Sequence, residues 1–64
     1  MAAQFKQKLQ AALNKFDLTV AENLLEEIQD AELHGYKSTA QEERLWERLS
    51  NCIHTYLRTM ASLQ

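Results

Sequence analysis

The chain has 64 residues with a formal net charge of −2, and it contains one glycine, one cysteine and no proline. A chain of this length buries only about 60% of the surface that its unfolded form exposes. We therefore expect a single domain over residues 1–64 that gains stability from self-association or from a partner. The lone Cys52 excludes an internal disulfide and a zinc site built on several cysteines.

The bulk composition also argues against several classes of protein. The negative net charge argues against a general nucleic-acid-binding protein, because such proteins carry a basic stripe that neutralises phosphates. No apolar run approaches the roughly 20 residues that a membrane span needs. The N-terminus lacks the apolar segment of a secretory signal. We expect a cytoplasmic protein without membrane contact.

The first predicted element is a helix over about residues 2–16. Its apolar side chains recur at steps of three and four residues, which places them on one stripe of a helix. They are Phe5, Leu9, Ala12, Leu13 and Phe16. Lysines beside the stripe would also suit an amphipathic helix on a membrane surface, but the core of so short a protein needs this stripe.

The second predicted element is a helix over about residues 20–34. The apolar stripe here is formed by Val20, Ala21, Leu24, Leu25, Ile28 and Ala31. Thr19 and Glu22 have the spacing of a capping box, which predicts where the helix begins. Gly35 is the one residue that adopts a left-handed conformation without strain, so the helix should end near His34.

The third predicted element is a longer helix over about residues 39–62. Capping boxes fit at Ser38–Gln41 and at Thr39–Glu42, so the helix should begin at residue 39 or 40. Its apolar stripe is wide and includes Leu45, Trp46, Leu49, Cys52, Ile53, Tyr56, Leu57, Met60 and Leu63. Together the elements predict an all-α fold, either three helices running up, down and up or a hairpin with a long C-terminal helix.

The unequal helix lengths predict a surface. At 1.5 Å per residue the third helix would extend to about 36 Å and the others to about 22 Å, so its end should project beyond them. Such an apolar end either binds a partner or a second copy, or frays as chain termini do. The candidate partner-binding residues are Trp46, Ile53, Tyr56, Leu57, Arg58, Met60 and Leu63. Trp46 has a second interpretation, as a core residue that seals the groove between the last two helices.

The segment Asp17–Gly35 carries six of the nine carboxylates and no lysine or arginine. Glu22, Glu26 and Asp30 form a row at four-residue steps, opposite the apolar stripe. Either this acidic row is a solvated face, or it is a docking surface for a basic partner. In the first case its charge is offset by the flanking Lys6, Lys8, Lys15, Arg44 and Arg48.

The sequence offers no catalytic, cofactor or metal site. The acidic row faces away from the core and lacks the Glu-x-x-His spacing of a carboxylate metal site. A protein this small should have no room for a ligand cavity of a few hundred Å³, so we expect no enzyme activity and no small-molecule substrate. Cys52 is predicted to be a small core residue, with a redox or interchain disulfide role as the alternative. His34 and His54 should be exposed.

These observations predict a small, non-enzymatic protein–protein interaction module. It would be an adaptor, regulator or co-chaperone of bacterial or phage type that docks through its C-terminal helix. The acidic row would add electrostatic selectivity. The alternative is an acidic DNA mimic that blocks a basic nucleic-acid-binding protein. A direct nucleic-acid binder would need its five flanking lysines and arginines on one face.

Overall fold

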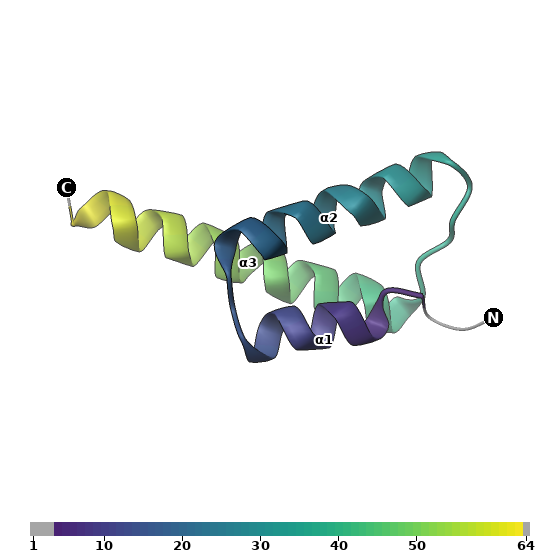
Figure 1. Cartoon of the computed structure of the whole chain (residues 1–64), viewed down its shortest axis with the longest axis horizontal. Coiled ribbons are helices and arrows are strands. Elements are labelled where there is room, and N and C mark those ends of the chain that lie inside the picture. Colours follow the sequence, from purple (N-terminus) through teal and green to yellow (C-terminus); the bar gives the residue numbers. More distant parts are fainter. Residues whose placement is uncertain (1–3, 64) are drawn as a thin grey trace.

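The computed structural model describes residues 4–63 and shows three helices, with no strand among those residues (Figure 1). Helix α1 spans Lys6–Asn14, α2 spans Leu18–Leu33 and α3 spans Ala40–Ser62. The helices run up, down and up, and α3 packs against both other helices. The all-α fold with a longest C-terminal helix is therefore confirmed. None of the helices described is both long and apolar enough to cross a membrane.

The core lies where the three helices meet. Its buried apolar residues are Phe5, Leu9, Ala12, Ala21, Leu24, Ile28, Leu49 and Ile53. All of them belong to the stripes predicted from the sequence, but Val20 and Cys52 of those stripes are exposed. Cys52 lies one turn beyond Arg48, which lines a groove with Asn14 at the end of α1. Because α1 ends at that level, it leaves the Cys52 thiol uncovered.

Helix α1 is shorter than the predicted range of 2–16, of which residues 2 and 3 lie outside the described part. It begins after Phe5, which has no side-chain cap of its own and instead donates its backbone N–H to Glu42. It ends at Asn14, because Lys15 leaves the helical conformation. The chain then turns so that the ring of Phe16 contacts that of Tyr56 at 5.7 Å between centroids.

Helix α2 begins two residues before the predicted position. The Asp17 carboxylate accepts the backbone N–H of Val20 at 3.1 Å and is the N-cap. The predicted capping box of Thr19 and Glu22 was therefore wrong, and Thr19 lies inside the helix. An aspartate is among the strongest N-caps and its charge complements the helix dipole, so Asp17 displaces the threonine.

Gly35 follows α2 with a φ of +100°, as the sequence predicted. A Cβ added to Gly35 would have no atom within 4 Å, so the backbone conformation alone resists substitution. We expect Gly35→Ala to lower the free energy of unfolding by about 1–2 kcal/mol, measured by urea denaturation followed by circular dichroism. Gly35→Asn should lower the free energy of unfolding by less than Gly35→Ala does, because asparagine tolerates a positive φ better than alanine. An alanine variant as stable as the parent would contradict this assignment.

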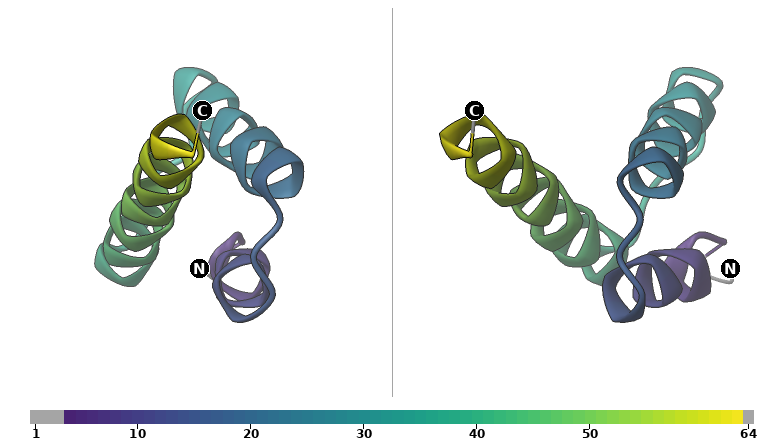
Figure 2. Two further views of the ribbon diagram at one scale, coloured as in Figure 1. Left: turned by 90° about the vertical axis from the view of Figure 1, so that its left-hand side faces the viewer. Right: turned by 60° about the vertical axis from the view of Figure 1, so that its left-hand side comes forward.

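Helix α3 begins with the second of the two predicted capping boxes. The Thr39 hydroxyl accepts the N–H of Glu42 at 3.1 Å, and the Glu42 carboxylate accepts the N–H of Thr39 at 2.8 Å. At 1.5 Å per residue α3 is about 34 Å long, against about 24 Å for α2 and 14 Å for α1. In the right-hand view of Figure 2, the C-terminal end of α3 stands clear of the other helices.

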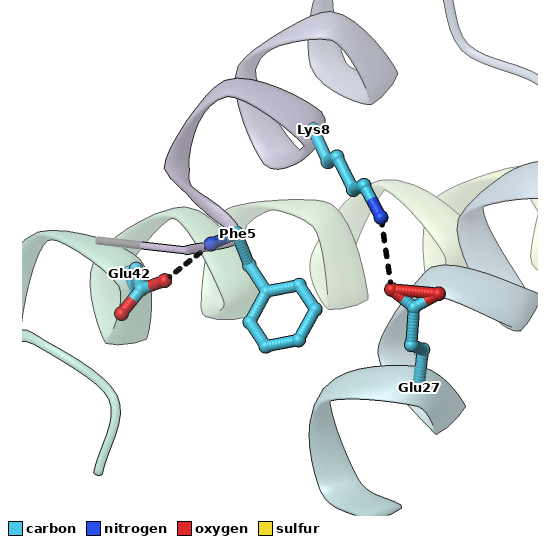
Figure 3. A network of polar contacts seen from close by, with 4 residues as sticks. All are labelled: Phe5, Lys8, Glu27 and Glu42. Atoms are coloured by element: carbon cyan, nitrogen blue, oxygen red, sulfur yellow. Dashed lines mark hydrogen bonds and ion pairs between the residues drawn. The ribbon is translucent and has the colours of Figure 1, made fainter. Parts of the chain in front are cut away.

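Glu42 also ties the beginning of α1 to α3 (Figure 3). Its side chain is 1% exposed and accepts hydrogen bonds from the Phe5 N–H and the Tyr36 hydroxyl, both at 2.7 Å. Burial alone would raise the pKa of Glu42, but the bonds from Thr39, Phe5 and Tyr36 outweigh it and lower the pKa. Partial burial and the bond to Glu42 raise the pKa of Tyr36.

A second polar contact joins α1 to α2. Lys8 Nζ lies 3.2 Å from a carboxylate oxygen of Glu27 and 5.8 Å from the centre of the Phe5 ring (Figure 3). Both charged side chains are half exposed or more, so this pair contributes little to stability. The helices are held together mainly by the apolar core and by the Glu42 contacts.

Candidate protein-interaction site

The C-terminal part of α3 presents an exposed apolar face. We define this tail face as Tyr56, Leu57, Met60 and Leu63, whose exposed fractions are 39%, 46%, 43% and 77%. Its residues continue the stripe that Leu49 and Ile53 bury in the core. The core ends where Tyr56 meets Phe16, and no residue among 4–63 covers the face beyond that point. The predicted projection of the helix is thus confirmed.

The other three predicted partner-binding residues lie elsewhere. Ile53 is only 8% exposed and belongs to the core, so it offers little surface to a partner. Trp46 is half-buried against the core, in agreement with its interpretation as a sealing residue. Arg58 is exposed but lies two residues from Met60, which places it on another side of the helix.

The acidic row points to solvent, as predicted. Glu22, Glu26 and Asp30 are all exposed. Within residues 4–63 the ion pairs are Lys8–Glu27 and the weak contact of Asp30 with His34 at 3.9 Å. The flanking lysines and arginines therefore form no ion pair with the row in the described chain. Its negative charge is open to the solvent.

The two sides of α3 carry opposite charges. On the side of α2, a hollow of about 400 Å³ contains three carboxylates and is lined by Gln29, Glu32, Ser38, Glu43, Trp46 and Glu47. On the side of α1, Arg44 and Arg48 line a hollow with Lys6. Lys8 and Lys15 lie instead in a third hollow, between α1 and α2. The five basic residues thus do not share one face, as a direct nucleic-acid binder would require.

The hollow between α1 and α2 corrects the expectation that the protein has no space for a ligand. It has a volume of about 760 Å³ and is an open groove on the surface. Its floor is formed by apolar residues including Ala11, Ala12, Phe16 and Leu24. The short α1 and the small alanines keep the two helices from closing over this groove. Among its charged residues, Lys8 and Glu27 neutralise each other.

The potential metal ligands remain apart. His34 and His54 are exposed, as predicted, and the His34 ring nitrogen Nδ1 lies 2.8 Å from the backbone oxygen of Asp30. Cys52 was predicted to be in the core but is exposed. In the part of the chain that the structure describes, no three His, Cys, Asp or Glu side chains form a group that could hold a metal ion.

Sequence reasoning recognised Glu42 only as a helix-capping residue. Its position in a capping box predicted one hydrogen bond to Thr39, but not its burial or its contact with Phe5. The only available signal was that Glu42 falls on the apolar stripe of α3, three residues before Leu45 and seven before Leu49.

In comparisons with known proteins, no protein-family model, no curated protein and no solved structure matches this chain.

Proposed function

We propose that the protein is a non-enzymatic interaction module that inserts the tail face of α3 into an apolar groove of a partner protein. The observation that carries this proposal is the exposure of four large apolar side chains on one uncovered helix end. Isolated apolar side chains are common on protein surfaces, but a contiguous set on one helix face is typical of an interaction site.

The spacing of the tail face supports this mode of binding. Tyr56, Met60 and Leu63 occupy positions i, i+4 and i+7 of a helix that is already formed. These are the anchor positions that an amphipathic helix uses in an apolar groove. A preformed helix loses little entropy on binding, and each fully buried anchor contributes about 1.5–3 kcal/mol. The tail face therefore supports binding without any charged contact.

The acidic row would act at longer range in the same encounter. No lysine or arginine among residues 4–63 pairs with the row, and only Asp30 has a weak contact with a histidine, so its field extends into the solvent over about 8 Å at physiological salt. Such a field accelerates the approach of a basic partner and disfavours an acidic one. In this proposal the acidic row determines the selectivity and the association rate, and the tail face provides most of the affinity.

Met60→Glu tests the proposed docking surface. The new charge would have to be buried in the groove of the partner, so we expect capture of the partner from source cells to fall at least about tenfold. Thr55→Glu is the matched control, because it adds the same charge to an exposed position away from the tail face. Capture of the same proteins by both variants and the parent would contradict the proposal.

Hydrogen exchange of the pure protein provides a second test. A formed tail should protect the amides of residues 56–62 above the level of an unfolded chain, and partner binding should protect them further. If these amides exchange as fast as those of an unfolded chain in a monomeric protein, the tail is frayed and the proposed interface fails.

A second candidate function follows from the exposed acidic row, which pairs with no lysine or arginine in the described chain. Its three carboxylates repeat about every 6 Å along α2, and a mimic of DNA charge would present them to a basic nucleic-acid-binding protein. Reversing the charges of Glu22, Glu26 and Asp30 separates the two functions. The reversal should abolish binding by a mimic, whereas it should only slow a partner that docks on the tail face.

A further inference from the structure

A basic groove runs between α1 and α3. We define it by the hollow of about 220 Å³ that Lys6, Gln10, Gln41, Arg44, Leu45 and Arg48 line. A second hollow, of about 400 Å³, adjoins it and shares Gln10, Leu45 and Arg48. The lining of the two hollows contains three cations and three side-chain amides but no carboxylate.

The positive charge of this groove is not neutralised within the described chain. Neither Lys6 nor Arg44 nor Arg48 takes part in an ion pair among residues 4–63. The acids nearest in sequence do not compensate, because Glu43 and Glu47 line the hollow on the opposite, α2 side of α3. The groove is therefore complementary in charge to an anionic group.

The spacing of the cations fits the acidic row of the same protein. Arg44 and Arg48 are four residues apart on α3, which separates them by about 6 Å along the helix. Glu22, Glu26 and Asp30 repeat at the same interval on α2. Along the groove, residues 41–48 span about 11 Å, and residues 22–30 span about 12 Å. A helix carrying this row therefore matches the groove in length and in charge spacing.

An apolar contact complements the charges. Leu33 is 84% exposed and lies seven residues after Glu26, on the same side of α2 as the row. The half-buried Leu45 also lines the groove. The acidic row with Leu33 and the basic groove with Leu45 are thus complementary in both polarity and charge.

We propose that the acidic row of one copy of this chain docks in the basic groove of a second copy. The row belongs to α2 and the groove to α1 and α3, so the contact joins two different surfaces. In a head-to-tail contact each copy uses its row on one neighbour and its groove on another, so repeated contacts build open chains, or rings where the rotation closes them. This self-association does not involve the tail face. It uses the acidic row, so it competes with the steering role proposed for the row above.

Nucleic-acid phosphates would also suit three cations, but the row repels them and the net charge is −2. A second copy of the chain neutralises the charge of the groove and that of the row in the same contact. Because every ion pair across the contact is exposed to solvent, the association is weak and sensitive to salt.

Sedimentation velocity over a range of protein concentrations tests this contact by charge exchange. We expect the parent to associate at low ionic strength and to become monomeric at about 0.5 M salt. The double variants Arg44→Glu/Arg48→Glu and Glu22→Lys/Glu26→Lys should each lose at least about tenfold in association constant. An equimolar mixture of the two should associate again, because the reversed groove of one variant then meets the reversed row of the other, and the unchanged row of the first meets the unchanged groove of the second.

Two controls isolate the contact. Lys15→Glu/Lys37→Glu changes the net charge as much as Arg44→Glu/Arg48→Glu does, but both lysines lie outside the groove. We therefore expect a smaller loss in the association constant than for Arg44→Glu/Arg48→Glu. Met60→Glu should leave the salt-sensitive association intact, because Met60 belongs to the tail face. Circular dichroism confirms that each variant is folded.

Three results would overturn the proposal. The first is a parent that stays monomeric at low salt and about 1 mM protein, the upper range of weak association. The second is association that resists salt and is lost only in Met60→Glu, which would place self-association on the tail face. The third is failure of the charge-reversed mixture to associate. If the monomeric parent instead binds a single-stranded oligonucleotide and Arg44→Glu/Arg48→Glu does not, the groove is a phosphate site.

Discussion

Glu42→Ala is expected to lower the free energy of unfolding by about 3–5 kcal/mol, because it leaves three buried or part-buried hydrogen-bond donors without an acceptor. The carboxylate accepts bonds from the Phe5 N–H, the Thr39 N–H and the Tyr36 hydroxyl. A chain of this size has a total stability of about 3–10 kcal/mol. The variant should therefore lose a large part of its stability, which urea denaturation followed by circular dichroism measures.

Glu43→Ala is the matched control, since Glu43 is exposed in the same first turn of α3. It should change the free energy of unfolding by less than about 1 kcal/mol. If both alanine variants were equally stable, the Glu42 contacts would contribute nothing and the assignment would be wrong.

The pH dependence of stability provides a second readout for Glu42. Its pKa is lowered in the folded protein, so its contribution is present above the unfolded value of about 4.3 and is lost as the pH falls through the lowered folded value. Glu42→Gln removes this titration. The difference in stability between the parent and Glu42→Gln should therefore shrink on acidification below about pH 4.3. A constant difference would show that the pKa of Glu42 is not lowered.

Leu49→Ala is expected to cost about 2–5 kcal/mol, through lost burial and the cavity left behind. Leu49 is fully buried in α3 at the centre of the core. Leu57→Ala makes the same change in the same helix where the side chain is 46% exposed, and it should cost less than about 1.5 kcal/mol. Urea denaturation of the two variants measures the contrast. Equal losses would mean that the tail face is buried in solution.

The two leucines also separate stability from binding. If the tail face docks on a partner, Leu57→Ala should weaken capture of the partner while the protein stays folded. Leu49→Ala should reduce capture only in proportion to the unfolded fraction, because Leu49 has no exposed surface to offer.

Most of the fold could be predicted because its signals are local. Thr39 caps a helix with atoms three residues away, and Gly35 needs only its own backbone conformation. The limits of α1 could not be predicted in this way. Its beginning depends on Glu42, and its end depends on the contact of Phe16 with Tyr56, so both are set by distant parts of the chain.

The candidate site, like the fold, could be predicted from the sequence only where it depends on local features. The exposed tail face followed from counting residues, because a longer helix must project beyond shorter ones. The burial of Ile53 and the exposure of Cys52 depend on where α1 and α2 end beside α3, which sequence periodicity does not reveal. The basic groove was missed because Arg44 and Arg48 alternate with Glu43 and Glu47, which the helix sorts onto opposite sides.

The hydrogen bond between Phe5 and Glu42 joins two residues that are 37 positions apart in the sequence, and it thereby closes a loop of the chain. Small proteins often close such loops with a disulfide, which restricts the unfolded chain and opens only on reduction. With a single cysteine, this chain fastens its beginning to α3 by a carboxylate instead. The closure therefore responds to protons and is indifferent to the redox state of its surroundings.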